Sequence, residues 1–122
     1  MGFSYMASPY THEDPDVRQR RFEQVCRAAA HMMDEGKVVF SAIAHGHAIE
    51  IYGAESRRDW EFWENQCINM LDTADELLVL TLDGWQDSVG VQREIDYAED
   101  CGIPTRYINP RFVSVVRQGS LA

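Results

Sequence analysis

A short apolar run near the middle of the chain, Glu76 to Leu82, is the feature that most restricts the fold. Leu77 to Leu80 are apolar at four successive positions, without the alternation expected of a strand that has one face in water. Such a run is typical of a parallel strand that is covered on both faces. It therefore predicts a parallel sheet with helices on both sides.

Helix-like patterns lie on both sides of this run. Apolar residues recur at intervals of three and four in three segments, which places them on one face of a helix. Asp14-Pro15 before the first segment and Gly36 after it are typical of a helix start and end. The predicted helices are 15–35, about 58–73 and 88 to about 101.

Short apolar stretches predict three further strands, at 3–7, 37–41 and 103–108. Because strands alternate with helices, we expect one α/β domain over residues 1–122, three-layered and flavodoxin-like (Rossmann-like), with a parallel sheet of four or five strands. Residues 42–55 are expected to be irregular, and 110–122 are left unassigned. The loops that should meet at one sheet edge, where ligands bind in such folds, are 8–14, 42–52 and 83–88.

The charge of the chain excludes one class of partner. Asp and Glu number 20 against 11 Lys and Arg, which gives a formal net charge of −9. Binding to a nucleic-acid polymer requires a basic face that neutralises many phosphates, and the sequence contains no such face. Small anionic ligands remain possible, because one arginine or a helix N-terminus can hold a phosphate.

The cysteines and the apolar runs predict a cytoplasmic protein without a membrane partner. Cys26, Cys67 and Cys101 are widely spaced and form no CxxC pattern, which favours buried free thiols over disulfides or a zinc site. The apolar runs are too short to span a membrane. The first residues also lack the charged region and the long apolar stretch of a signal peptide.

The segment Asp87-Ser88-Val89-Gly90-Val91-Gln92-Arg93-Glu94 is the most informative for function. Ser88 is a good N-cap, and Gly90 lets a ligand approach the first helical turn, whose free N–H groups can hold a phosphate. Glu94 lies beside the apolar stripe of this helix, so we expect a half-desolvated carboxylate near the ligand edge. The alternative is an ordinary surface glutamate paired with Arg93 or Arg58.

The run Ser88-Val89-Gly90-Val91-x-x-Glu94-Ile95-x-x-Ala98 resembles the catalytic motif of the nucleoside 2-deoxyribosyltransferase superfamily. The closest likeness is to its 2′-deoxynucleoside 5′-phosphate N-glycosidase branch. Three further segments resemble that family, in the same order along the chain: Tyr5-Met6-Ala7-Ser8-Pro9-Tyr10, Asp72-Thr73-Ala74-Asp75 and Cys101-Gly102-Ile103-Pro104. The likeness extends over residues 4–108; an extra Gly84-Trp85 and the pair Gln92-Arg93 depart from it.

The resemblance implies an enzyme, a hydrolase or transferase, acting on the N-glycosidic bond of a 2′-deoxynucleoside or its 5′-monophosphate without cofactor or metal. Glu94 would be the nucleophile that forms a covalent glycosyl intermediate. The N-terminal field of its helix and a hydrogen bond from Tyr5 would keep it ionised. Asp75 would assist or position the leaving base; the alternative is an ordinary aspartate at a helix C-terminus or strand edge. Ser88 and Gly90 would hold the 5′-phosphate.

The same resemblance places further residues beside the pocket. The remaining candidates for substrate binding are Ser8, Pro9, His45, His47, Trp85 and Asp87. Trp85 could stack on a base or cover the sheet edge. Two histidines at alternate positions of an extended segment could share a metal, but with no third ligand apparent we favour contact with the base or phosphate. Neighbouring subunits complete the sites of this family, so a homodimer or higher homo-oligomer is expected.

Two other functions are compatible with the sequence. A nucleotide-binding sensor could use the same fold and pocket without chemistry. A structural or partner-binding domain could use Trp60 and Trp63 as its contact surface, although these two side chains also suit internal packing.

Overall fold

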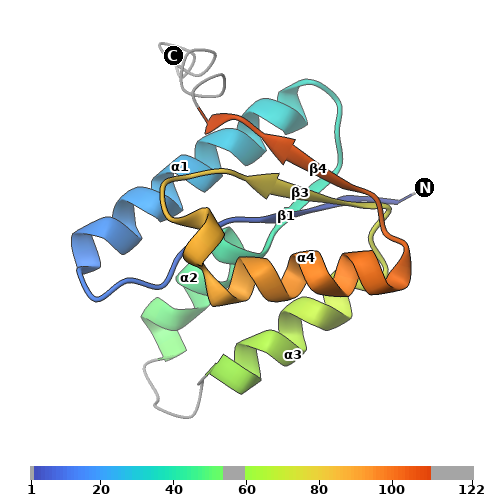
Figure 1. Ribbon diagram of the computed structural model, residues 1–122. Helices are drawn as coiled ribbons and strands as arrows, with labels where there is room; N and C mark the ends of the chain where they lie inside the picture. Colours follow the sequence, from blue (N-terminus) through green and yellow to red (C-terminus); the bar gives the residue numbers. More distant parts are fainter. Residues whose placement is uncertain (1, 54–59, 111–122) are drawn as a thin grey trace.

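The computed structural model describes residues 2–53 and 60–110, with the side chain of Trp60 outside the description. Its centre is a four-stranded, all-parallel sheet in the order β2-β1-β3-β4 (Figure 1). This arrangement confirms the α/β architecture that the apolar run predicts. The strands are β1 (Ser4–Ala7), β2 (Val39–Ser41), β3 (Glu76–Leu80) and β4 (Thr105–Ile108).

Four helices and one short 3-10 turn connect and cover the strands. Their bounds are α1 (Pro15–Asp34), α2 (Ala42–Gly53), α3 (Trp60–Leu71), η1 (Trp85–Asp87) and α4 (Val89–Cys101). Three of the four helices agree with the predicted segments. Asp14 caps α1 by accepting a hydrogen bond from the backbone N–H of Asp16 at 2.9 Å, and Ser88 caps α4 through the N–H of Val91 at 3.2 Å.

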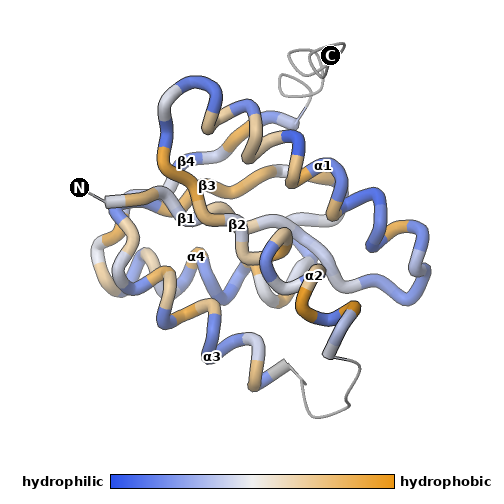
Figure 2. Tube along the Cα trace, turned by 180° about the vertical axis from the view of Figure 1, so that it is seen from behind, coloured by the Kyte–Doolittle hydropathy of each residue, from blue (hydrophilic) through white to orange (hydrophobic). Residues whose placement is uncertain are grey.

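Helix α2 corrects the prediction that residues 42–55 are irregular. Its sequence is apolar around nearly the whole circumference, so it shows no stripe with helical spacing. Figure 2 shows these hydrophobic residues directly after β2. The start of the helix is marked by Ser41, whose Oγ accepts a hydrogen bond from the backbone N–H of Ala44 at 3.1 Å. Packing, not amphipathic patterning, determines this helix.

The order of the strands explains which helix covers which face. The connection from β1 to β2 runs one way along the sheet, and those from β2 to β3 and from β3 to β4 run the other way. Because such crossovers are right-handed, α1 covers one face while α3 and α4 cover the opposite face (Figure 1). The reversal falls between β1 and β3, which is where ligands bind in open parallel sheets.

Each face of the sheet has its own hydrophobic core. Between α1 and the sheet lie Met6, Val25, Ala28, Ala29, Met32, Val39, Leu78, Leu80 and Leu82. On the face of α3 and α4 lie Tyr5, Ala7, Ala42, Leu71, Leu77, Val79, Val91 and Ala98. Successive residues of β3 alternate between these two cores, which explains why the run is apolar at every position.

The prediction that the three cysteine thiols are buried is wrong. Cys26 and Cys67 are half-buried, and Cys101 is exposed at the last residue of α4. Among the helices within 2–53 and 60–110, none has the length and apolar character needed to cross a bilayer. Residues 111–122 of the unassigned tail lie outside the described part of the chain.

Candidate active site

A buried carboxyl group and a buried phenol meet beneath the reversal point of the sheet. The hydroxyl of Tyr5 in β1 donates a hydrogen bond to Oε2 of Glu94 in α4, 89 residues further along the chain. Tyr5 is inaccessible to solvent and Glu94 is only 8% exposed. Glu94 shares the inward face of α4 with Val91 and Ala98, a position where an apolar residue would serve packing better.

Glu94 is not a surface glutamate paired with Arg93, whereas Arg58, the other partner considered, lies outside the described residues. Its neighbour Arg93 turns outward and pairs instead with Glu64 of α3, at 2.8 Å. No ion pair to Glu94 is present within the described residues. Among the residues that the structure describes, the carboxyl group is therefore desolvated without a countercharge, and Tyr5 donates a hydrogen bond to it.

Burial controls the protonation of this pair. It raises the pKa of Glu94 from 4.5 to about 7, and the hydrogen bond from Tyr5 opposes only part of that shift. Glu94 is the sixth residue of α4, beyond the first turn in which the helix N-terminus has most effect. Burial, followed by the charge of Glu94, raises the pKa of Tyr5 well above its usual value, so the phenol remains a hydrogen-bond donor.

A third group, the thiol of Cys67 in α3, lies against the same pair. Cys67 is half-buried and packs against the core cluster that contains Tyr5. Burial raises the pKa of the Cys67 thiol to about 11, and a hydrogen bond with Tyr5 opposes the shift. The sequence predicted only a buried thiol at Cys67, because spacing along a helix does not reveal which side chain of the sheet it will contact.

The N-terminus of α4 opens at the carboxyl edge of the sheet. A Cβ atom added to Gly90 would meet nothing nearer than the Oγ of Ser88 at 4.0 Å, so the space beside the first turn is open. Ser8 and Pro9 follow β1 at the same edge and are buried. The Oγ of Ser8 has no hydrogen-bond partner within the described residues, which is the state expected of a group that a ligand would satisfy.

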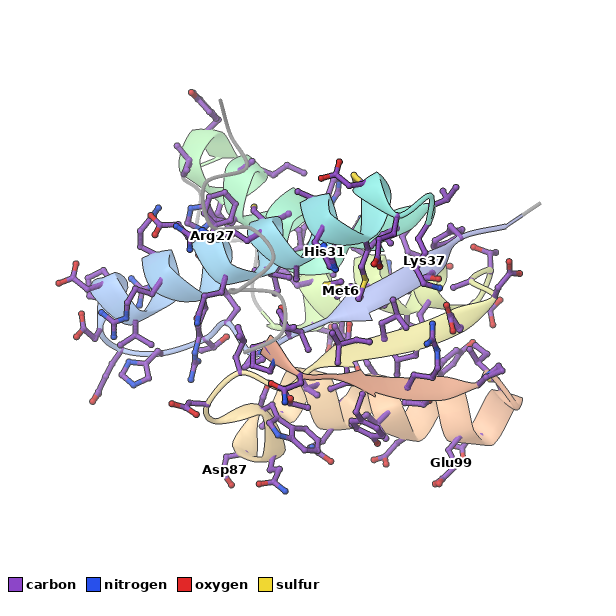
Figure 3. The ribbon with its side chains drawn as sticks, turned by 90° about the horizontal axis from the view of Figure 1, so that it is seen from above. Met6, Arg27, His31, Lys37, Asp87 and Glu99 are labelled. Carbon is purple, nitrogen blue, oxygen red and sulfur yellow. The ribbon has the colours of Figure 1, made fainter. Side chains whose placement is uncertain are left out.

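Trp85 and Asp87 lie in η1, between β3 and α4. The ring of Trp85 is half-buried and lies 5.5 Å from that of Tyr107 in β4, so it covers the edge of the sheet, one of the two roles predicted for it. Asp87 is exposed at the end of η1, as Figure 3 shows.

The two histidines lie on α2, which overturns the idea of a shared metal. Residues two apart on a helix point in different directions, unlike residues two apart on a strand. The ring of His45 lies 5.3 Å from Phe40, whereas His47 stacks on Phe22 at 3.9 Å and places Nδ1 2.8 Å from the hydroxyl of Tyr10. Within the described residues, no three His, Cys, Asp or Glu side chains converge as metal ligands.

Asp75 is not brought to Glu94. It precedes β3, and its backbone N–H donates to the carbonyl of Phe3 at 2.8 Å, so it lies at the amino end of the strands. An added Cβ on Gly2 would overlap its carboxylate, and Asp75 itself is exposed. The loops that carry Ser8 and Ser88 are at the opposite edge.

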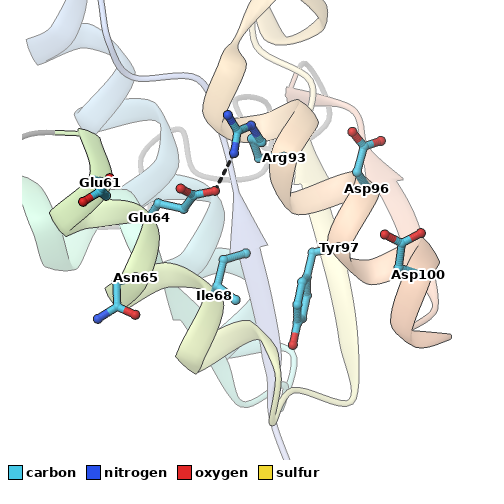
Figure 4. A pocket seen from close by; sticks show the side chains of 8 residues that line it. All are labelled: Glu61, Glu64, Asn65, Ile68, Arg93, Asp96, Tyr97 and Asp100. Carbon is cyan, nitrogen blue, oxygen red and sulfur yellow. Dashed lines mark hydrogen bonds and ion pairs between the residues drawn. The ribbon is translucent and has the colours of Figure 1, made fainter.

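A groove on the outer side of α4 is separate from the buried pair. It has a volume of about 480 Å³ and lies between α3 and α4 (Figure 4). Its lining residues are Glu61, Glu64, Asn65, Ile68, Arg93, Asp96, Tyr97 and Asp100. Glu94 is not among them, so the groove and the candidate active site are distinct.

Trp63 joins α3 to α2. Its indole N–H donates to Glu50 at 3.1 Å, and its ring lies against Gly46, where an added Cβ would be 3.5 Å away. Internal packing, one of the two roles predicted for Trp63, therefore accounts for its position. The side chain of Trp60 lies outside the described residues.

The fold and site define a three-layer parallel α/β protein with a buried carboxyl–phenol pair under the reversal point of its sheet. The chain belongs to a family described as a domain of unknown function, DUF1937, whose model matches residues 2–108. No match to the chain was found among curated proteins. The matched range contains every strand and helix described above.

Proposed function

We propose that the protein cleaves or transfers the N-glycosidic bond of a 2′-deoxynucleoside or its 5′-monophosphate, with Glu94 as the nucleophile. One observation carries this proposal: a carboxyl group is buried with no countercharge among the described residues and accepts a hydrogen bond from a phenol, beneath the reversal point of a parallel sheet. The motif around Glu94 resembles that of the nucleoside 2-deoxyribosyltransferase superfamily, and the parallel sheet is consistent with that superfamily.

The first step transfers the sugar to the protein. The ionised carboxylate of Glu94 attacks C1′ and forms a C–O bond as the bond between C1′ and the base nitrogen breaks. The bonding electrons leave with the base, which takes up one proton from solvent. The negative charge stabilises the oxocarbenium-like transition state, and burial strengthens that interaction because little water screens it.

The second step returns the protein to its starting state. A water molecule, or the nitrogen of a second base, attacks C1′ and displaces the carboxylate of Glu94. The attacking group loses one proton to solvent. Hydrolysis thus converts nucleoside and water into free base and deoxyribose, or into deoxyribose 5-phosphate from the monophosphate. No resident metal or cofactor takes part in this scheme.

The carboxyl edge of the sheet supplies the groups for binding. The unpartnered Oγ of Ser8 and the open first turn of α4 at Gly90 are suited to the sugar and its 5′-phosphate. Asp75 has no part in this scheme, because it lies at the other edge. We further propose a homodimer or higher oligomer; light scattering should give a multiple of the 14.0 kDa chain mass, and a monomer would contradict this.

Base release by two variants of α4 tests the proposal. Deoxynucleosides, deoxynucleotides and their ribose counterparts are incubated with wild type, Glu94→Gln and Glu99→Gln, and free base is measured by chromatography. Glu99 is the matched control because it is exposed on the same helix (Figure 3). We expect release by wild type and Glu99→Gln, and binding without release by Glu94→Gln.

Other outcomes would reject the assignment. Equal turnover by wild type and Glu94→Gln would exclude Glu94 as nucleophile. Nucleotide binding by wild type without release of base would instead favour the sensor function. Mass spectrometry of acid-quenched wild type should find a deoxyribosyl adduct on the peptide that contains Glu94.

A further inference from the structure

One arginine bridges the two loops that border the reversal point of the sheet. Arg21, in the second turn of α1, donates from Nη1 to the carbonyl of Thr11 and from Nη2 to the carbonyl of Asp83, both at 3.0 Å. Thr11 belongs to the loop after β1, and Asp83 to the loop after β3. These carbonyls lie 10 and 62 residues from Arg21 along the chain.

The loop after β3 is shaped around this guanidinium group. Gly84 has φ of +90°, a conformation that residues with a side chain rarely adopt. A Cβ atom at Gly84 would also lie only 2.8 Å from Nη2 of Arg21. The absence of a side chain at this position therefore lets the backbone of the loop approach the guanidinium closely.

An arginine is required for this geometry. Its planar fork directs two N–H groups toward separate acceptors, whereas a lysine offers a single ammonium group. Within residues 2–53 and 60–110, no carboxylate forms a salt bridge with Arg21. The guanidinium group is thus held in place by the two backbone carbonyls of the loops.

The two loops carry the groups that face a ligand. The loop after β1 contains Ser8 and Pro9, and the loop after β3 leads through η1 to Ser88 and the first turn of α4. The spacing of the two loops therefore sets the distance between Ser8 and the first turn of α4, the groups proposed to bind the ligand. The side chain of Arg21 links the two loops through its hydrogen bonds.

We infer that Arg21 is a positioning residue that couples the loop after β1 to the loop after β3 and so fixes the spacing between Ser8 and the first turn of α4. It acts through the two loops and not by contact with reacting atoms. The inference rests on the proposed function only for its effect on kinetics. The coupling of the loops is a property of the free protein.

Backbone amide hydrogen exchange of the free protein tests the coupling without any substrate. The matched control is Arg18, which is also in α1 but forms hydrogen bonds with the carbonyl of His12 and with Tyr10, both within the loop after β1. Arg21→Ala should accelerate exchange in both loops, by on the order of tenfold or more. Arg18→Ala should accelerate exchange only in residues 8–14, and Arg20→Ala, at an exposed site, in neither loop.

Unchanged exchange in residues 83–88 of folded Arg21→Ala would overturn the inference. So would equal acceleration of both loops in Arg18→Ala. If Arg21→Ala does not fold, Gly84→Ala tests the same contact, because the added Cβ disturbs the approach of the loop to the guanidinium group. Gly84→Ala should accelerate amide exchange in both loops. A folded Gly84→Ala variant with wild-type exchange in both loops would also overturn it.

A kinetic measurement separates this inference from the proposed function. If wild type releases base, Arg21→Ala should raise KM on the order of tenfold and change kcat much less, and Arg21→Lys should be intermediate. A fall in kcat with unchanged KM would contradict a positioning role. If wild type releases no base, the proposed function fails, and the exchange experiment still decides whether Arg21 couples the loops.

Discussion

At the scale of single residues, the position of Glu94 costs the protein stability. Its pKa is about 7 in the folded protein against an ordinary value of 4.5, because burial disfavours the carboxylate. A raised carboxyl pKa means that the folded state binds the proton more tightly than the unfolded state does. The free energy of unfolding therefore falls as pH rises from about 4.5 to 7 and stays low above that range.

Replacing Glu94 by Gln should remove this pH-dependent penalty. The amide has a similar shape and cannot ionise, so Glu94→Gln should gain stability relative to wild type as pH rises, by up to about 3 kcal/mol at pH 8. Chemical denaturation of both proteins at pH 5 and pH 8 measures the difference. A stability difference that is independent of pH would show that Glu94 titrates normally.

The same pKa predicts how activity depends on pH. Only the carboxylate can attack C1′, so kcat/KM for base release should rise through pH 7 and level off above it. Tyr5→Phe removes the hydrogen bond that lowers the pKa of Glu94, and its profile should therefore shift to higher pH with a lower maximum. A flat wild-type profile between pH 6 and 8 would contradict the assignment.

The cysteines should differ in reactivity with alkylating reagents. Burial raises the pKa of Cys67 to about 11, so its thiolate is scarce at neutral pH, whereas Cys101 is exposed. Limited iodoacetamide at pH 7.5 should label Cys101 well before Cys67, as measured by peptide mass mapping. Faster labelling of Cys67 would mean that its contact with Tyr5 opens readily in solution.

At the scale of elements, the sequence predicted the amphipathic helices, which have apolar residues on one face and polar residues on the other. Helices α1 and α4 also have recognisable caps at Asp14 and Ser88, and both helix starts were located well. Helix α2 was missed because it is apolar nearly all round. That error carried His45 and His47 into an extended segment that the structure does not contain.

The position of Asp75 shows a second limit of motif-based reasoning. A residue that directly precedes a parallel strand lies at the amino edge, opposite the loops that bind ligands. The direction of the chain therefore already argued against a role for Asp75 beside Glu94. For Cys67 no such signal existed, because its contact with Tyr5 depends on how α3 packs against the sheet.

An ionic cluster at the amino edge of the sheet links β1, β3 and β4. Glu76 in β3 accepts two hydrogen bonds from Arg106 in β4, at 2.9 and 3.1 Å, and one from Ser4 in β1 at 2.6 Å. Hydrogen bonds lower the pKa of Glu76 to about 2, and the bond from Arg106 contributes most. The charges of Arg106 and Lys37 act in the same direction.

Because this pKa is lowered, the stabilisation is complete above pH 4.5 and is lost as pH falls toward 2. Glu76→Gln should destabilise the protein by about 1–2 kcal/mol at pH 7, a value reduced by the exposure of Arg106. Denaturation at pH 7 and pH 2.5 measures it. An equal loss at both pH values would indicate a packing effect.

At the scale of the whole molecule, strand order determines where the candidate site lies. With β1 and β3 in the centre, the direction of the connections reverses between them, and Tyr5, Ser8 and the loop at Asp83 all border that point. The alternating pattern of strands and helices predicted a parallel sheet. It did not specify the strand order, which depends on contacts between distant segments.

The separation of Tyr5 and Glu94 has a consequence for biosynthesis. The phenol emerges with β1, and the carboxyl group arrives 89 residues later with α4. A nascent chain that stops before α4 contains no reactive pair, whatever else of it has folded. The chemistry proposed for this centre must therefore await translation of α4, and we expect truncated chains that lack α4 to release no base.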